Sequence, residues 1–334
     1  MQAADSPRGS IIVTVIVLNW NGKHLLVDCL QSLIRQTFRD FETILIDNGS
    51  TDGSAEWVAT HYPDVRLIPL KMNLGFAGGN NVGINLATGQ YIVLLNNDTE
   101  VEPNWLEQLY AHICTDDRIA ACDSKVLYFD RRDTIWTSGG TYSIAGTTTF
   151  RWQMQKDSRD LHQPADVFVA GACSAMYRKS VLKEIGLLDE DFFIYFEDVD
   201  WSFRAHLRGY RIINVPASRV YHKVSSTVQY HSALSVYLCQ RNVSAVFIKN
   251  MPSPLLLRYW PLHLAYMLGS LAYFSKIGNA KAFMKAKIRV LREMPVLLQK
   301  RKRTQKMRTV SAEAIDSLLD RAWLGPKIEK YHAV

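Results

Sequence analysis

The stretch from Ile11 to Asp52, IIVTVIVLNWNGKHLLVDCLQSLIRQTFRDFETILIDNGSTD, decides the fold class. It opens with a continuous apolar, β-branched run, Ile11–Leu18, which is typical of a strand buried on both faces of a sheet. Leucine and isoleucine at helical spacing follow within His24–Gln36, and a second strand pattern covers Glu42–Ile46. Strand, helix and strand in this order predict a parallel sheet with right-handed crossovers.

The same alternation continues to about residue 115. It predicts helices over Ser54–His61, Gly79–Ala87 and Pro103–Thr115 and strands over Val65–Leu70 and Tyr91–Leu95. From Ile119 the pattern is less regular, with strands expected over Val167–Tyr177 and Arg211–Val215 and a helix that starts after Tyr195 and ends near Gly209. The polar segment Arg131–Asp160 is interpreted as a mobile excursion.

We therefore expect an α/β fold with a mostly parallel central sheet and a C-terminal helical extension. The expected organisation is a flexible N-terminus at residues 1–10, a catalytic domain at 11–250 and a helical, basic region at 251–334.

Composition narrows the class of protein. With 334 residues, 48% hydrophobic and 21% charged, the chain is globular rather than disordered or collagen-like. Its five cysteines are scattered and form no Cys-x-x-Cys pair, which favours a reducing compartment over a disulfide framework. Residues 1–10 lack the apolar core of a signal peptide, so we expect a cytoplasmic protein.

The positive charge is concentrated in one segment. Lys276–Arg308 holds twelve lysines and arginines against one acid, Glu293, and so carries +11. Because the whole chain carries +7, the remainder carries −4. Tyr259–Ser275 is free of charged residues but too short to span a bilayer. We interpret the region as helices lying on an anionic membrane surface, with a solvated helical cap as the alternative. The acidic body and the absence of a known motif argue against nucleic acid as a partner.

Polar clusters follow the predicted strands, and the carboxyl ends of parallel strands are where open sheets bind ligands. Asp98, in the cluster after Tyr91–Leu95, is a hard oxygen donor suited to Mg²⁺ or Mn²⁺ beside substrate phosphates. A turn-forming Asn/Asp cluster is the alternative. Asp47 can contact a base or ribose, although helix capping explains the residues after it equally well.

A second acidic cluster lies in the stretch FFIYFEDVDW. Crowded carboxylates against aromatic rings should have raised pKa values, as a general base requires. Asp198 is the candidate base with Glu197 beside it, and a helix N-cap is the competing role for Asp198. His222, at the end of RIINVPASRVYH, can complete a divalent-metal site with Asp98, or be an ordinary surface histidine.

Taken in order, these motifs resemble family 2 glycosyltransferases of the GT-A fold, in particular their bacterial rhamnosyltransferase-like branch. The likeness covers about residues 11–250 and rests on Asn19-Trp20-Asn21, Asp47–Asp52, Asn73-x-Gly75, Asn96-Asn97-Asp98, Phe196–Trp201 and His222.

The resemblance implies a role for each position. It assigns Asp198 as catalytic base with Glu197 beside it, and Asp98 and His222 as ligands of a divalent metal, Mg²⁺ or Mn²⁺. Nucleotide-sugar binding falls to Asn19, Asn21, Asp47, Asn48, Asn73, Gly75, Asn80, Asn96 and Asn97. The chain departs from the family at Asn96, where aspartate is common, and Gln240-Arg241-Asn242 is not the Gln-x-x-Arg-Trp motif of processive members.

The predicted function is therefore transfer of one sugar with inversion, from a nucleotide sugar to a hydroxyl of a glycan or lipid-linked glycan. The setting implied is cell-surface polysaccharide synthesis at the inner face of the plasma membrane. dTDP-rhamnose is the donor that the resemblance indicates, with UDP-hexoses as the alternative. A nucleotidyltransferase and a non-catalytic nucleotide-sugar-binding protein are the competing hypotheses.

Overall fold

The computed structural model describes residues 11–158, 161–224 and 231–322. The predicted flexible N-terminus at residues 1–10 lies outside these ranges, as does the end of the predicted C-terminal region.

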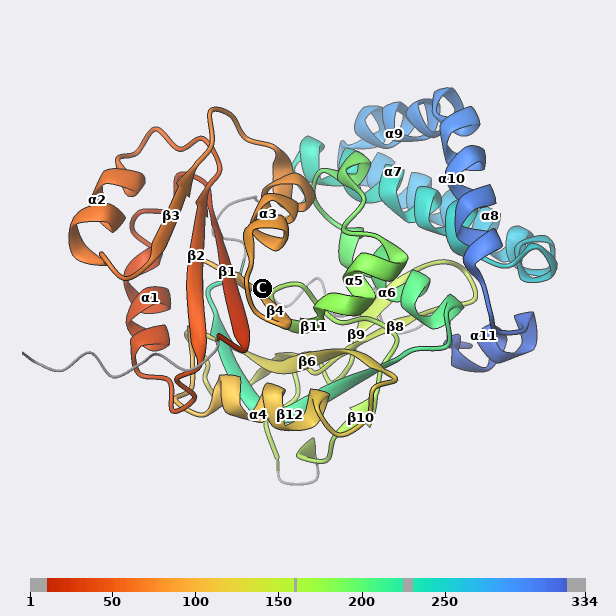
Figure 1. Cartoon of the computed structure of the whole chain (residues 1–334). Helices are drawn as coiled ribbons and strands as arrows, with labels where there is room; N and C mark the ends of the chain where they lie inside the picture. The colour runs from red at the N-terminus through yellow and green to blue at the C-terminus, as the bar shows by residue number, and fades with distance from the viewer. Residues whose placement is uncertain (1–10, 159–160, 225–230, 323–334) are drawn as a thin grey trace, which may run out of the picture.

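The N-terminal part alternates strands and helices as the sequence predicts (Figure 1). The elements are β1 (Val13–Asn19), α1 (Leu26–Ile34), β2 (Phe41–Asp47), α2 (Ser54–His61), β3 (Arg66–Pro69), α3 (Gly75–Leu86) and β4 (Tyr91–Asn96). β1 pairs in parallel with β2 on one side and β4 on the other, and β2 pairs in parallel with β3. Helix α3 begins four residues before the predicted start at Gly79.

The middle part adds β5 (Thr99–Val101), α4 (Trp105–Ile113), β6 (Ile119–Tyr128), β7 (Ile135–Thr137), β8 (Gly140–Tyr142), β9 (Thr148–Phe150), β10 (Ala165–Asp166), β11 (Ser174–Arg178), α5 (Lys179–Ile185), the 3₁₀ helix η2 (Glu190–Phe192), α6 (Glu197–Leu207) and β12 (Arg211–His222). In the described part of the chain the sheet order is β10-β12-β6-β11-β4-β1-β2-β3. The sheet is mostly parallel, but β11 runs antiparallel to both of its neighbours, β4 and β6.

Two predicted strands have different bounds in the structure. The strand expected over Val167–Tyr177 begins only at Ser174, because the N–H groups of Gly171 and Ala172 donate to carboxylates instead of a neighbouring strand. The strand expected to end at Val215 continues as β12 to His222. Pro216 has no N–H to donate, and the pairing with β6 shifts register between Val215 and Arg219 before it resumes.

The structure also corrects the interpretation of Arg131–Asp160 as a mobile excursion, for the residues that it describes. This segment contains β7, which joins the main sheet, and the β8–β9 hairpin. Lys125, fully buried on β6, pairs with Asp157 at 2.7 Å, and Arg219 on β12 pairs with the same carboxylate at 2.8 Å. These buried ion pairs fasten the segment to the sheet.

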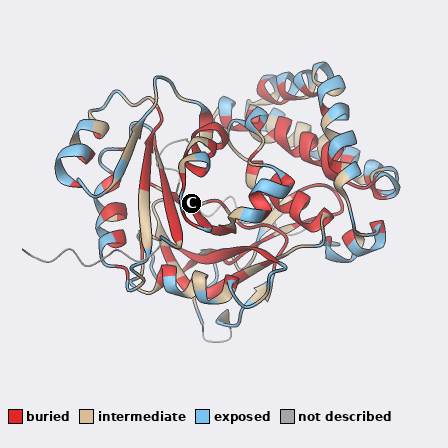
Figure 2. Cartoon of the chain, viewed as in Figure 1, coloured by how far each residue is buried: buried red, intermediate tan, exposed pale blue. Residues whose placement is uncertain are grey.

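Apolar residues on the two faces of the sheet form two cores. Val13, Val15 and Val17 of β1 pack with α1 and α4, while Ile16 faces the opposite core with α3, α5 and α6. Burial is concentrated in the strands, whereas α2 is largely exposed (Figure 2). The sheet therefore supplies a rigid frame that presents its carboxyl edge to ligands.

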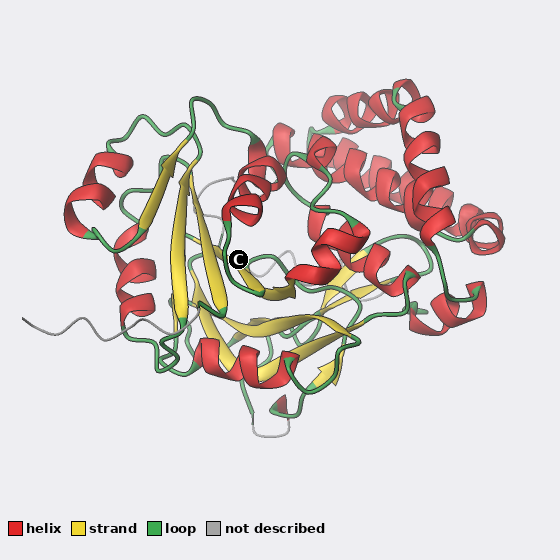
Figure 3. Ribbon diagram, in the orientation of Figure 1, coloured by secondary structure: helices red, strands yellow, loops and turns green. Residues whose placement is uncertain are grey.

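The last helices of the chain gather beside α5 and α6, at the upper right of Figure 3. They are α7 (Ala233–Asn250), α8 (Ser253–Lys276), α9 (Ala280–Arg292), α10 (Met294–Met307) and α11 (Ala312–Leu318). A third core joins Phe203 of α6 to Phe247 of α7 and Ile315 of α11. The helical region thus packs directly against the helix that carries Asp198.

Candidate active site

Polar side chains meet at the carboxyl ends of β1, β2 and β4. The register places Asn19 opposite Asp47 and Leu18 opposite Asn96. Asn19 donates to Oδ1 of Asp47 at 3.1 Å and accepts from Nδ2 of Asn97 at 2.8 Å. Asp47 is buried and also accepts from the Ser54 hydroxyl at 3.2 Å. The structure therefore brings Asn19, Asp47 and Asn97 together, as the sequence predicted.

Two loops that flank this cluster are tied together through Asn21. Asn21 is in the left-handed region with φ of 50°, and its backbone N–H donates to the Ser50 hydroxyl at 2.9 Å. Its Oδ1 accepts from the backbone N–H of Thr51 at 2.8 Å. The side chain of Asn21 consequently shapes the loop after β2.

Asn48 holds the glycine-rich loop in a similar way. Its Nδ2 donates to Oδ1 of Asn73 at 3.0 Å and to the carbonyl of Gly75 at 3.1 Å. Gly75 has a φ of +74°, and a Cβ there would lie 2.5 Å from the ring of Phe193, so only glycine fits. Asn80 differs from these residues: its amide donates to the carbonyl of Phe76 within α3, at 2.9 Å. The structure thus ties Asn80 to its own helix and not to the strand-end cluster.

Asp98 and His222 face each other at the same edge. His222 Nε2 lies 3.1 Å from Asp98 Oδ1 as an ion pair, without the alignment of a hydrogen bond. Burial lowers the pKa of His222, but the neighbouring Cys173 and Asp98 outweigh burial and hold that pKa well above its ordinary value. Asn96, two residues before Asp98, is held through its backbone: its carbonyl accepts from the Thr99 hydroxyl at 2.6 Å.

The Asp98–His222 pair fits a divalent cation that is partly coordinated by substrate. In the described residues, Asp98 Oδ1 and His222 Nδ1 are buried and have no hydrogen-bond partner. Carboxylate and neutral imidazole are donors that Mg²⁺ and Mn²⁺ accept together with phosphate oxygens, so His222 would give up its extra proton when the cation binds. No cluster of three or more candidate ligand side chains occurs in residues 11–158, 161–224 and 231–322, so a metal here needs oxygen atoms from its substrate.

Asp198 lies near the start of α6 and is half-buried. Its Oδ2 accepts from the N–H of Ala172 at 3.2 Å and its Oδ1 from the N–H of Val199 at 2.7 Å. Burial raises the pKa of Asp198, and the two backbone donors oppose that rise. Glu197 is more deeply buried: burial, followed by the charge of Asp198, raises its pKa well above the ordinary value, and its Oε2 has no hydrogen-bond partner.

Two consecutive residues join the Asp198 site to the Asp98 site. Ala172 binds Asp198, and Cys173, the next residue, accepts from the N–H of Asn96 at 3.0 Å and contacts His222. Consecutive Cα atoms are about 3.8 Å apart, so Asp198 and His222 contact neighbouring residues of the loop before β11.

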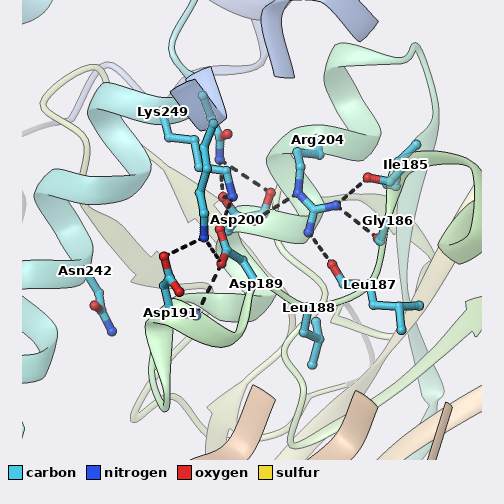
Figure 4. Close-up of polar contacts among 12 residues, drawn as sticks. Ile185, Gly186, Leu187, Leu188, Asp189, Asp191, Asp200, Arg204, Asn242 and Lys249 are labelled. Atoms are coloured by element: carbon cyan, nitrogen blue, oxygen red, sulfur yellow. Dashed lines mark hydrogen bonds and ion pairs between the residues drawn. The ribbon is translucent and has the colours of Figure 1, made fainter. Parts of the chain in front are cut away.

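Asp200, the third acid of the cluster, has a different environment (Figure 4). Its carboxylate is fully buried, pairs with Arg204 at 2.9 Å and Lys249 at 2.8 Å, and accepts from Asn250 at 2.8 Å. Lys249 also pairs with Asp189 at 2.6 Å. Because both carboxylate oxygens of Asp200 are taken by Arg204, Lys249 and Asn250, Asp200 has a structural role that stabilises α6.

Sequence reasoning missed one residue of the site, Asp123. Asp123 on β6 is fully buried, and it accepts from the N–H of Gly171 at 3.0 Å, which fixes the loop that leads to Ala172. Burial raises the pKa of Asp123 well above its ordinary value, and nearby Asp198 adds to the rise. The small residues of Gly171-Ala172-Cys173 within an apolar run were the available signal, since small residues allow close backbone approach to a side chain.

The mostly parallel sheet gathers polar side chains and the Asp98–His222 pair at its carboxyl edge, which defines an α/β protein of the class that binds its ligands at that edge. Residues 14–186, half of the chain, match the family model described as Glycosyl transferase family 2. The chain belongs to this family and is a glycosyltransferase, as the sequence motifs indicated.

Curated relatives agree with this assignment. The chain is 26% identical over 268 residues to N-acetylglucosaminyl-diphospho-decaprenol L-rhamnosyltransferase of Mycobacterium tuberculosis (strain ATCC 25618 / H37Rv), a match that covers 69% of this chain and 85% of that protein. It is 25% identical over 224 residues to the uncharacterized glycosyltransferase YwdF of Bacillus subtilis (strain 168), which covers 66% and 77%.

Solved structures confirm the GT-A fold. The structure of GalNAc-T7 with UDP, GalNAc and Mn²⁺ aligns with a TM-score of 0.62 and 18% identity over 85% of this chain and 57% of that one. The mannosyltransferase of Pyrobaculum calidifontis in complex with GDP-Man and Mn²⁺ aligns with a TM-score of 0.54 and 18% identity over 91% and 86%.

Proposed function

We propose that this glycosyltransferase is metal-dependent and inverting, and that it moves one sugar from a nucleotide-sugar donor to a hydroxyl of a glycan or lipid-linked glycan. The observation that carries the proposal is the arrangement of Asp198 beside the Asp98–His222 pair, with Ala172 and Cys173 between them. A general base next to a diphosphate site is what direct displacement of a nucleoside diphosphate requires.

Asp198 is the proposed catalytic base. A raised pKa brings its carboxylate closer to the pH at which it works, which makes it a better proton acceptor. Burial and the charge of Asp198 raise the pKa of Glu197 well above its ordinary value, so a second negative charge beside Asp198 is disfavoured. Asp198 accepts the proton of the acceptor hydroxyl while that oxygen attacks the anomeric carbon opposite the leaving group, which inverts the configuration.

Asp98 and His222 are the proposed ligands of Mg²⁺ or Mn²⁺. Such a cation, when bound, supplies Lewis-acid neutralisation of the charge that grows on the leaving diphosphate. Asn19, Asn21, Asp47, Asn48, Asn73, Gly75, Asn96 and Asn97 form the proposed donor-sugar-nucleotide site, and the tie of Asn80 to Phe76 makes its predicted contact with the donor indirect.

The proposed sugar and acceptor rest on the relatives. The name of the Mycobacterium tuberculosis protein describes an L-rhamnosyltransferase acting on a lipid-linked sugar. We carry this over as rhamnose for the sugar and a lipid-linked glycan for the acceptor, in the synthesis of cell-surface polysaccharide.

A lipid-linked acceptor is best reached from the membrane surface, and we place the protein at the inner face of the plasma membrane. Helix α8 exposes Leu257, Leu264 and Leu268 on one face, at 78%, 43% and 60%. Helix α9 exposes Met284, Ile288 and Leu291 among the basic residues Lys281, Lys285 and Arg292. Apolar side chains flanked by cations suit an anionic lipid surface, and this supports residues 251–334 as the membrane-associating region. Among the described residues, no helix has the length and apolarity needed to cross a bilayer.

The test is a screen of nucleotide sugars with lipid-linked and free glycan acceptors, with and without Mn²⁺. Release of a nucleoside diphosphate together with a glycosylated product supports the proposal. Release of pyrophosphate identifies a nucleotidyltransferase, and a donor that is bound but unaltered identifies a binding protein. Transfer that persists in chelator contradicts the metal dependence, and retention of the anomeric configuration contradicts the inverting mechanism.

A further inference from the structure

The segment 192–196, which leads into α6, has an unusual backbone. Phe193, Tyr195 and Phe196 have φ angles of 63°, 71° and 70°, in the left-handed region that non-glycine residues rarely adopt. A segment with three such residues keeps its shape only where surrounding contacts impose it. The contacts on this segment therefore matter for whatever it positions.

This short segment links the two halves of the active site. At one end the carbonyl of Phe193 accepts from the N–H groups of Phe76 and Ala77 at 2.5 and 3.2 Å, at the start of α3. The Phe193 ring also occupies the space beside Gly75. At the other end Phe196 is the N-cap of α6, two residues before Asp198. The conformation of 192–196 thus sets the distance between the glycine-rich loop and Asp198.

One side chain holds this conformation. Asn242, fully buried on α7, directs its Nδ2 at the carbonyls of Phe192, Ile194 and Tyr195, at 3.1, 3.0 and 2.8 Å. Its Oδ1 accepts from Nη1 of Arg241 at 2.9 Å, and the same Nη1 donates to the carbonyl of Asp191 at 2.5 Å. The carboxamide is thereby oriented so that its N–H groups, and not its oxygen, face the segment.

Ion pairs hold helix α7 in place on the face that carries Asn242. Lys249 lies two helical turns after Asn242 and pairs with Asp189 and Asp200, so both side chains project from α7 toward the residues before and within α6 (Figure 4). Arg241 also pairs with Glu293, at the start of α10, at 2.7 Å. The helix that carries Asn242 is therefore held in place by ion pairs on both sides of that residue.

We infer that Asn242 is a positioning residue for sugar transfer: it holds the 192–196 carbonyls so that Asp198 keeps its place relative to the donor loop. The inference rests on the proposed function, because it takes Asp198 as the base. Misplacing a catalytic group by about 1 Å costs on the order of 10²-fold in rate. Loss of the hydrogen bonds from Asn242 should therefore lower kcat. Asn48 and Asn73 continue to hold the glycine-rich loop before α3, so the KM for the donor should stay nearly constant.

The experiment compares Asn242→Ala and Asn242→Asp with a matched control, Asn250→Ala. Asn242→Asp keeps the size of the side chain but replaces the donor NH₂ with an oxygen. Asn250 is an equally buried asparagine of α7, and Asp200 keeps its pairs with Arg204 and Lys249 when Asn250 is removed. We expect both Asn242 variants to lose at least about tenfold in kcat per folded molecule, with less than about threefold change in donor KM, and the control to keep its kcat.

Hydrogen exchange supplies a readout that does not depend on activity. The N–H groups of Phe76 and Ala77 should exchange faster in both Asn242 variants and at the wild-type rate in Asn250→Ala. Unchanged exchange, or an Asn242→Asp variant with full kcat, overturns the inference and leaves Asn242 with a packing role. If the wild-type protein transfers no sugar from any donor, the proposed function fails. The hydrogen-exchange measurement still decides in that case whether Asn242 holds the segment 192–196.

Discussion

The backbone N–H of Ala172 donates to Oδ2 of Asp198, which fixes the carboxylate on α6 to the loop before β11. The carbonyl of the next residue, Cys173, binds Asn96 at the end of β4. Adjacent residues of this loop thus hold the Asp198 carboxylate and the end of β4, two residues before Asp98. This relationship underlies the first predictions.

Replacing Asp198 by asparagine should lower the rate of sugar transfer by about 10²–10⁴-fold, because a positioned base contributes that much. The isosteric amide keeps an oxygen for the N–H of Ala172, so the fold is retained. Steady-state kinetics with the identified donor measure the effect, and circular dichroism checks folding. Asp166→Asn, at an exposed acid on β10, serves as the control. Near-normal turnover of Asp198→Asn removes this residue from the role of base.

The raised pKa of Glu197 predicts how stability depends on pH. Its ordinary pKa is 4.5, and the folded protein resists its ionisation. Above pH 4.5 the unfolded chain loses this proton while the folded chain keeps it, so the free energy of unfolding falls with rising pH until the folded pKa is reached. Glu197→Gln removes this loss. Urea unfolding from pH 4.5 to 8 should show the variant gaining stability over wild type as pH rises; a difference independent of pH contradicts the raised pKa.

Asp98→Asn and His222→Ala should each weaken Mn²⁺ binding in the presence of the nucleoside diphosphate by at least about tenfold, since even outer-shell partners of a metal contribute that much. Isothermal titration calorimetry measures the affinity. His61→Ala, at an exposed histidine of α2, should bind as wild type does. Equal affinity in all three variants places the cation elsewhere.

The double variant Leu264→Glu/Leu268→Glu should abolish flotation with anionic liposomes, because two carboxylates on the exposed face of α8 oppose both apolar insertion and the attraction of the basic residues. Ile34→Glu, at an exposed isoleucine of α1, is the matched control and should float like wild type. Failure of the wild-type protein to float at low salt refutes the membrane proposal outright.

Lys249→Met should destabilise the protein by about 3–5 kcal/mol, the usual cost of removing one partner from a buried ion pair. Asp189 and Asp200 would retain Lys300 and Arg204, respectively, which favours the lower end of that range. Chemical denaturation measures the change. A variant as stable as wild type would mean that the two carboxylates find compensation that the native contacts do not show.

Much of the fold was predictable because each strand and helix in the first hundred residues has a clear pattern of apolar residues. The apolar runs that became β1, β2 and β4 are buried on both faces, so they read as parallel strands without further information. The edge at which Asn19, Asp47 and Asp98 gather followed from that topology alone.

The rest depended on contacts distant in the sequence. Nothing local marks Asp123 as a partner of Gly171 or Asn242 as a partner of the 192–196 carbonyls, because these pairs are separated by about 50 residues. The start of β11 was predicted wrongly for the same reason: the N–H groups of Gly171 and Ala172 donate to the side chains of Asp123 and Asp198, which lie far away in the chain.

The burial of α7 between α6 and the last helices has a practical consequence for biochemists. A gene shortened before residue 233 would encode every carboxylate of the candidate site but would lack Asn242, Lys249 and the C-terminal members of the third core, such as Phe247 and Ile315. Such a fragment would contain the acidic residues but not the helices that hold them in position. Recombinant preparations should therefore retain the C-terminal third of the polypeptide. Detergent or lipid can cover the exposed apolar residues of its outer helices, which need not be deleted.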